Sequence, residues 1–202
     1  MTAQTSVRPT RTTRVAVILT ELFAPVVLIF ALLLAVAVHS TGSWARGLLL
    51  GAVAAFFAGG MPYLIMLRGI RGGQLNDRHL RLREQRPRMM AIGLISASLG
   101  LGAMVALGAP RELFGVVAAM VAGVAVALII SSVWKISIHT ACVAGTIAVL
   151  AVVFGPPALW LTPLIAAIAW ARVHLQDHTM AQVIVGATVG AVVAAGVMAL
   201  LA

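Results

Sequence analysis

The sequence contains few of the residues on which soluble enzymes depend. It has one cysteine, Cys142, so it can form no internal disulfide and has no Cys-x-x-Cys metal site. Asp and Glu total 5, which gives little support to a carboxylate-held Mg²⁺ site, and we predict neither a metal nor another cofactor. Charged residues make up only 9% of the chain, whereas 62% is hydrophobic and the mean hydropathy is +1.09. This composition excludes a soluble globular domain and is typical of polytopic membrane proteins.

The basic residues greatly outnumber the acidic ones. Lys and Arg total 14, of which only Lys135 is a lysine, and the formal net charge is +9. Such a balance can indicate nucleic-acid binding, but here the charges are confined to positions that flank apolar runs. Anionic membrane lipids or phosphorylated substrates explain the charge better, and we predict no nucleic-acid partner.

Seven apolar segments follow a polar N-terminal stretch. Residues 1–13 have no pattern that could pack, so we predict a disordered tail followed by one transmembrane domain over residues 14–202. The expected segments are Val15–Val38, Gly47–Leu67, Met89–Leu107, Leu113–Val133, Thr140–Phe154, Ala158–Ala171 and Val183–Ala202. Most can cross about 30 Å of hydrocarbon at about 1.5 Å per residue, whereas the fifth and sixth are short for full crossings. We therefore expect an all-α, polytopic integral membrane helical bundle of about six to seven transmembrane segments.

Two of these segments carry residues that are unusual in a membrane span. Glu21 and Pro25 interrupt the first, and the carboxylate needs a partner such as an arginine of the site, or else lies near the interface. Gly186 and Gly190 form a GxxxG face in the last. The simplest interpretation is a close helix contact within the bundle, and a homodimer through the last span is the alternative.

Three polar clusters separate the apolar segments, and counting crossings brings them together. The clusters are Arg68–Arg88, Lys135–His139 and Arg172–His178, and two crossings lie between one and the next, so all three emerge on one face. The N-terminal tail lies on the same face, which then holds every basic residue except Arg46 and Arg111. The positive-inside rule predicts that this face is cytoplasmic, and we expect an integral protein of a bacterial plasma membrane.

The shared face gathers residues that suit phosphoryl chemistry. They are Arg86, His139, Arg172 and His178, with His79, Ser137 and Gln182 as possible further members. Guanidinium groups offer paired donors that match phosphate oxygens, and a neutral imidazole nitrogen can attack phosphorus to form a phosphohistidine. A second imidazole can protonate the leaving oxygen.

These residues resemble the signature of the type 2 phosphatidic acid phosphatase superfamily. Its three parts are Lys, six residues, Arg-Pro; then Pro-Ser-Gly-His; then Ser-Arg, five residues, His, three residues, Asp. The corresponding residues here are His79 at the lysine position, beside Arg78, with Arg86-Pro87; then Ile136-Ser137-Ile138-His139; then Ala171-Arg172, His178 and Gln182. The resemblance covers residues 78–190.

The resemblance implies a role for each matched position. His178 would be the nucleophile, His139 the general acid, and Arg172 a catalytic phosphate ligand. The other phosphate-binding residues would be Arg86, Ser137, His79 and Arg78. Gln182 lacks the charge of the aspartate that would orient and activate the nucleophile, although it can accept a hydrogen bond; Asp177 or Glu21 would then supply the charge.

The implied function is that of an integral membrane phosphatase. It would hydrolyse a phosphomonoester or diphosphate of a lipid or isoprenoid through a phosphohistidine intermediate, independently of metal. Its partners would be that substrate and the surrounding membrane lipids. The alternative is a catalytically impaired member of the family that acts as an anionic-lipid-binding membrane protein.

Overall fold

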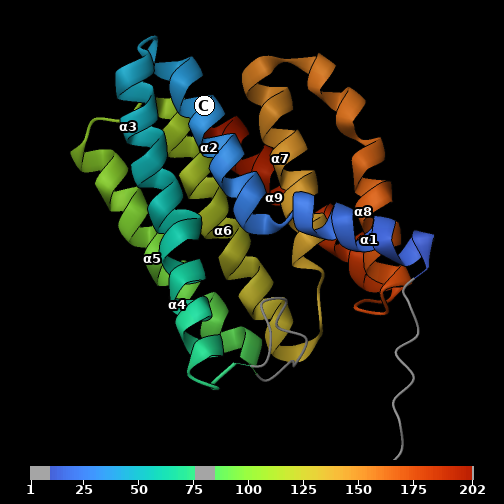
Figure 1. The fold of residues 1–202 in the computed structure, drawn as a ribbon. Coiled ribbons are helices and arrows are strands. Elements are labelled where there is room, and N and C mark those ends of the chain that lie inside the picture. Colours follow the sequence, from blue (N-terminus) through green and yellow to red (C-terminus); the bar gives the residue numbers. More distant parts are fainter. Residues whose placement is uncertain (1–9, 76–84, 202) are drawn as a thin grey trace, which may run out of the picture.

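The computed structural model describes residues 10–75 and 85–201, and every regular element within them is a helix (Figure 1). The expectation of an all-α bundle is therefore confirmed for this part of the chain. The elements are α1 Arg11–Leu22, α2 Pro25–Thr41, α3 Trp44–Ala55, the π-helix η1 Phe56–Gly60, α4 Met61–Arg71, α5 Arg86–Ala106, α6 Arg111–Val133, α7 Ile138–Phe154, the 3₁₀-helix η3 Pro156–Leu161, α8 Pro163–His174 and α9 Met180–Leu201.

Five helical stretches within the described residues are long and apolar enough to cross a membrane. They are Trp44–Arg71, Arg86–Ala106, Arg111–Val133, Pro156–His174 and Met180–Leu201. The pair α1 and α2 makes a sixth if both belong to one crossing, and α7 is a shorter apolar helix of 17 residues. The segment predicted over Ala158–Ala171 is longer than expected because η3 continues directly into α8.

The first apolar run does not form one continuous helix. α1 ends at Leu22, α2 begins at Pro25, and the two helices are bent by 43°. Proline has no backbone N–H and its ring clashes with the carbonyl one turn earlier, so it interrupts a continuous helix but is tolerated in the first turn of a new one. The bend sets α1 across the side of α8 (Figure 1), where Thr13 Oγ1 lies 3.3 Å from His174 Nε2 in a hydrogen bond.

The C-terminal end of the predicted disordered N-terminal tail is also wrong. Residues 1–13 are predicted to be disordered, yet α1 already begins at Arg11. Thr10 caps the helix, since its side-chain oxygen accepts a hydrogen bond from the backbone N–H of Thr13 at 3.2 Å. A threonine in this position satisfies a donor that the first helical turn cannot pair internally.

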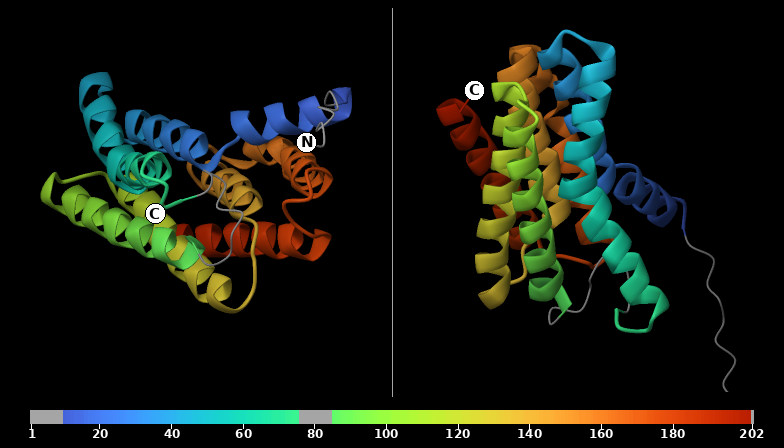
Figure 2. Two further views of the ribbon diagram at one scale, coloured as in Figure 1. Left: turned by 60° about the horizontal axis from the view of Figure 1, so that its bottom comes forward. Right: turned by 90° about the vertical axis from the view of Figure 1, so that its left-hand side faces the viewer.

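From α2 onward the helical stretches alternate in direction (Figure 2). The start of α5, the link between α6 and α7 and the link between α8 and α9 consequently lie at one end of the bundle, the lower end in Figure 1. Arg46 lies at the opposite end, where its Nη2 donates to the carbonyl of Gly108 at 3.0 Å.

α7 and α9 form a very close contact through the glycine face predicted in the last span. A Cβ atom at Gly190 would collide with the carbonyl oxygen of Ala141, and one at Gly186 with that of Ser137. The GxxxG face therefore serves a contact within the bundle, so a homodimer through α9 would have to use its other, exposed residues, such as Ile184 and Val192.

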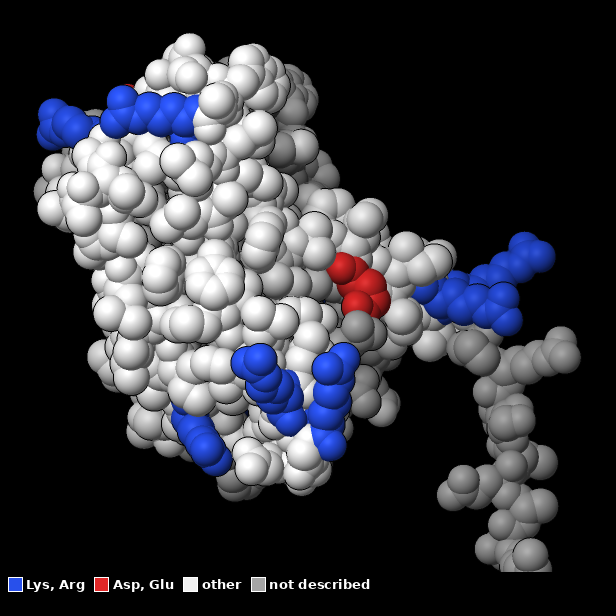
Figure 3. All heavy atoms as spheres, turned by 60° about the vertical axis from the view of Figure 1, so that its left-hand side comes forward, with Lys and Arg blue, Asp and Glu red and all other residues white. Residues whose placement is uncertain are grey.

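The outer surface is divided into charged ends and an apolar belt. Figure 3 shows Lys and Arg side chains near the upper and lower ends of the bundle. Between these ends lies a broad surface of uncharged residues, with an acidic group and a further basic group at intermediate height on the right. Large apolar side chains are exposed in this belt, among them Ile95 at 62%, Ile129 at 70% and Val192 at 64%. Several long apolar helices with such a surface are compatible with a membrane protein.

Candidate active site

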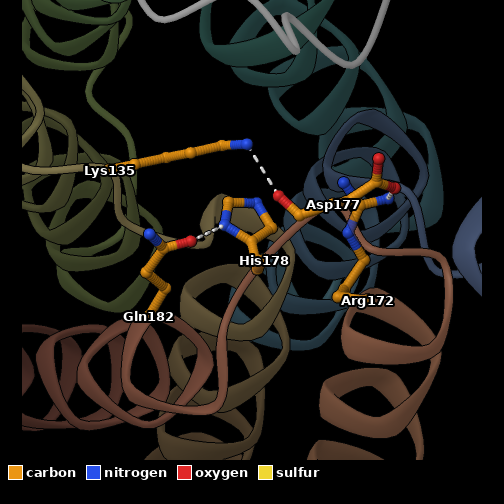
Figure 4. A network of polar contacts seen from close by, with 5 residues as sticks. All are labelled: Lys135, Arg172, Asp177, His178 and Gln182. Atoms are coloured by element: carbon orange, nitrogen blue, oxygen red, sulfur yellow. Dashed lines mark hydrogen bonds and ion pairs between the residues drawn. The ribbon is translucent and has the colours of Figure 1, made fainter.

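The three polar clusters of the sequence meet at the lower end of the bundle. Arg86, in the first turn of α5, donates from Nη1 to the carbonyl of Ile136 at 3.0 Å, which ties α5 to the link between α6 and α7. Lys135 in that link donates from Nζ to the carbonyl of Asp177 at 2.7 Å, which ties it to the link between α8 and α9 (Figure 4). The two bonds hold segments far apart in the sequence in direct contact.

A tight turn connects the end of α8 to the residue expected to be the nucleophile. The carbonyl of Arg172 accepts hydrogen bonds from the backbone N–H groups of Asp177 at 3.1 Å and His178 at 3.2 Å. Within the turn, Gln176 has a φ of 56°, a left-handed conformation that few residues other than glycine adopt. The chain thus folds back so that His178 returns to the end of the helix that carries Arg172.

Gln182 orients His178 from the first turn of α9. Its Oε1 lies 3.0 Å from His178 Nδ1 and accepts the backbone N–H of Thr179 at 3.2 Å, while Thr179 Oγ1 accepts the backbone N–H of Gln182 at 3.4 Å (Figure 4). The reciprocal pair of Thr179 and Gln182 is a capping box, a motif that begins a helix with Ser or Thr and has Glu or Gln three residues later. The same side chain therefore starts α9 and positions the imidazole.

These bonds fix the tautomer of His178. A backbone N–H can only donate, so the atom of Gln182 that faces Thr179 is the carbonyl oxygen and not the amide nitrogen. That oxygen can only accept, so Nδ1 of His178 carries the hydrogen. The lone pair of the neutral imidazole is consequently on Nε2, the nitrogen that a nucleophilic histidine would use.

The surroundings of His178 favour its neutral form. Burial lowers the pKa of His178 from 6.5 to about 3, opposed by the hydrogen bond to Gln182 and reinforced by the positive charges of Arg86, Arg172 and Lys135. Burial penalises the charged imidazolium, and nearby cations repel it. At neutral pH the Nε2 lone pair is available, and the cations that suppress protonation are also suited to bind a phosphate.

Arg172 is held by a buried ion pair. Its Nη1 lies 3.0 Å from Oδ2 of Asp177, and the two side chains are only 2% and 5% exposed. A buried guanidinium needs a counter-charge, because an isolated charge is costly to remove from water. Asp177 was expected to support His178 by supplying the charge that Gln182 lacks; the structure instead places its carboxylate on Arg172, and Gln182 occupies Nδ1 of the imidazole.

The expected catalytic residues line one cavity of about 450 Å³. Its polar end is formed by Arg86, His139, Arg172 and His178, with Glu21 from the end of α1. His139 is buried in the first turn of α7, and Glu21 is half-buried. A volume of this size lies within the range of small-molecule sites. The two histidines and the two arginines therefore line one shared cavity, and this cavity is large enough to hold a phosphate group.

Some of the other predicted site residues do not line this cavity, and two of them lie outside the described part of the chain. Ser137, expected to donate to a phosphate oxygen, is fully buried and does not line the cavity, and its Oγ has no hydrogen-bond partner among the described residues. Its donation to a phosphate stays a prediction. Arg78 and His79 lie outside the described residues. The sequence analysis did not include Lys135 among the site residues, although the structure shows that it donates to Asp177. The available signal was its position two residues before Ser137.

Comparison with known proteins yields no relative. No family model matches the chain, and neither the curated proteins nor the solved structures contain a significant match.

Proposed function

We propose that the protein is an integral membrane phosphatase that hydrolyses a phosphomonoester or diphosphate of a lipid or isoprenoid through a phosphohistidine. The observation that carries the proposal is the orientation of His178. Its Nδ1 is engaged by Gln182, its Nε2 holds the lone pair, and it lines the same cavity as Arg86 and Arg172. A neutral imidazole beside two fixed guanidiniums is the arrangement that attack on a phosphate requires.

The first chemical step transfers the phosphoryl group to the protein. The Nε2 lone pair of His178 forms a bond to phosphorus while the bond from phosphorus to the leaving oxygen breaks and leaves its electron pair on that oxygen. His139, in its protonated form, gives the oxygen a proton. Arg86 and Arg172 offset the charge on the remaining phosphate oxygens, and Gln182 accepts from the Nδ1–H of the phosphorylated, positively charged ring.

The second step returns the protein to its starting state. Water attacks phosphorus, the bond from phosphorus to Nε2 breaks, and the pair of electrons returns to the imidazole of His178. His139, neutral after the first step, accepts the proton from the water. The products are inorganic phosphate and an alcohol, or a monophosphate when the substrate is a diphosphate.

The distribution of the basic residues supports an active site on the cytoplasmic side of the membrane. Arg68, Arg71, Arg88 and Lys135 lie at the same end as the site, whereas Arg46 and Arg111 lie at the other. This asymmetry follows the positive-inside rule. In cells, a membrane-impermeant thiol reagent should label a cysteine at the exposed Ser43 and not one at the exposed Gln74, in a Cys142→Ala background; the reverse pattern would contradict the cytoplasmic assignment.

The test of the proposal is phosphate release from lipid phosphates and prenyl diphosphates by the purified protein in detergent with EDTA present. Wild type should release phosphate from at least one of them, and His178→Ala should release none. His174→Ala is the matched control, because His174 is exposed and bonded to α1 rather than lining the cavity, and this variant should keep its activity. No release by wild type, or equal release by wild type and His178→Ala, would refute the proposal and favour the anionic-lipid-binding alternative.

A further inference from the structure

The cavity continues beyond the polar end as an apolar groove. It runs between α2, α4, α5, α6, α7 and α9, and its lining there is made almost entirely of small or aliphatic residues. The far end is formed by Leu32, Val116, Val149 and Ala194, which belong to the buried core of the bundle. A phosphate site and an apolar groove are therefore parts of one space.

The groove is about as deep as one leaflet of a membrane. Along α5 its lining runs from Arg86 to Ala97, and along α7 from His139 to Val149. At about 1.5 Å per helical residue, both stretches span about 15 Å. The hydrocarbon core of a bilayer is about 30 Å thick, so the groove reaches from the polar end to about the middle of the membrane.

Two glycines keep the groove open. Gly93 on α5 and Gly123 on α6 both line it, and a Cβ atom at either position would meet nothing within 4 Å. Larger side chains would thus fit sterically within the fold, but they would fill the space. Gly102 and Gly196 also have open space around the missing Cβ, yet they do not line the groove.

We propose that this groove binds the hydrocarbon chain of a single-chain lipid phosphate, with the phosphate at His178 and the chain end near Val149. The proposal rests on the function proposed above and names its substrate class. The depth of the groove matches the length of a hydrocarbon chain that lies in the adjacent leaflet. A cavity of about 450 Å³ also has the size of a site for one small ligand. The chain can be alkyl or isoprenoid, since both offer the same apolar surface.

The experiment compares long-chain and short-chain phosphonates, whose carbon–phosphorus bond this chemistry does not cleave. Dissociation constants for dodecylphosphonate and ethylphosphonate are measured by calorimetry in one detergent, and their ratio is taken for each protein. Wild type should bind the dodecyl compound more tightly. Gly93→Leu and Gly123→Leu should reduce this preference by about tenfold or more, because each methylene removed from an apolar contact weakens binding by up to about fourfold. Their affinity for ethylphosphonate should stay within about twofold of wild type.

Gly102→Leu and Gly196→Leu are the matched controls, and both should keep the wild-type preference. An unchanged preference in Gly93→Leu and Gly123→Leu, or an equal loss in the controls, would overturn the proposal. The same holds if a two-chain phosphonate binds more tightly than dodecylphosphonate. A parallel titration with farnesylphosphonate distinguishes an isoprenoid from an alkyl chain. Because binding is measured without turnover, a protein that shows this pattern but releases no phosphate would refute the catalysis and support the groove.

A second measurement needs no substitution. Cys142 is the only cysteine of the chain and lines the groove. Dodecylphosphonate should slow the reaction of Cys142 with a small membrane-permeant thiol reagent, whereas ethylphosphonate at equal site occupancy should not. Equal labelling rates with the two compounds would overturn the proposal.

Discussion

Replacing Gln182 by glutamate should raise the pKa of His178 and move the pH range of activity. The variant keeps an acceptor oxygen for Nδ1 and for the Thr179 N–H, since glutamate also completes a capping box. It adds a negative charge beside the ring, where two opposite unit charges about 4 Å apart attract by about 4 kcal/mol at an effective dielectric constant of about 20. One pKa unit corresponds to about 1.4 kcal/mol, so the pKa of His178 should rise by about 3 units.

The higher pKa of His178 in Gln182→Glu should change kcat/KM in opposite directions above and below that pKa. In wild type the pKa of His178 is about 3, so the imidazole stays neutral throughout the physiological range. In Gln182→Glu the ring should become protonated below about pH 6, and kcat/KM relative to wild type should fall there. Above that pH the carboxylate stabilises the positively charged phosphohistidine, and the variant should be faster.

The comparison variant is Gln182→Met, which has a similar length and no acceptor oxygen. It leaves Nδ1–H buried without a partner, at a cost of about 1–3 kcal/mol, and kcat should fall by about fivefold to a hundredfold. The pKa and tautomer of His178 are read by NMR on protein labelled with ¹⁵N-histidine, and kcat/KM is measured against pH. The reasoning is wrong if Gln182→Glu leaves the pKa unchanged and Gln182→Met leaves the Nδ1–H tautomer and the rate unchanged.

Stability should also depend on pH through His178. Its pKa is lower in the folded than in the unfolded state, so its contribution is complete above about pH 6.5 and is lost as the pH falls toward about 3; thermal unfolding should show a smaller loss in Gln182→Glu. Asp177→Asn removes the counter-charge of buried Arg172 and should cost about 3–5 kcal/mol of stability, whereas a cost below about 1 kcal/mol would contradict the buried ion pair. Lys135→Met removes a charge-assisted hydrogen bond worth about 1.5–3 kcal/mol and one cation that lowers the pKa of His178, so the protein should be less stable and that pKa should rise by NMR; an unchanged pKa would exclude the electrostatic role. Gly190→Ala should lower the unfolding temperature because its Cβ meets the Ala141 carbonyl, whereas Gly196→Ala should not, and equal effects would contradict the close α7–α9 contact.

Much of the arrangement of the helices could be predicted from the sequence because long apolar helices are easy to recognise in it. Long apolar runs identify the helices, and counting crossings places Arg86, His139 and the Arg172–His178 turn at one end. The structure brings these residues to one cavity. The break at Pro25 was visible as a proline in the run, but its effect on direction depends on how α1 packs against α8, which local sequence does not encode.

The finer organisation of the site depends on contacts between segments. The capping box of Thr179 and Gln182 is readable from spacing, yet that its oxygen also binds His178 follows only from the turn that folds back over α8. Lys135 donates to Asp177, which lies 42 residues further along the chain, and the Asp177 carboxylate pairs with Arg172 rather than with the imidazole. The direction in which a side chain of a short turn points depends on the segments that pack against the turn. Sequence spacing alone therefore did not predict these partners.

The most direct test of the central claim is to trap the covalent intermediate. Wild-type protein is mixed with a hydrolysable lipid phosphate or prenyl diphosphate, quenched at alkaline pH, where phosphohistidine is retained, and digested for mass spectrometry. We expect a phosphoryl group on the peptide that contains His178, localised to that imidazole, and none in Arg172→Ala. Turnover without any phosphorylated histidine, or with the phosphoryl group on another residue, would contradict the account.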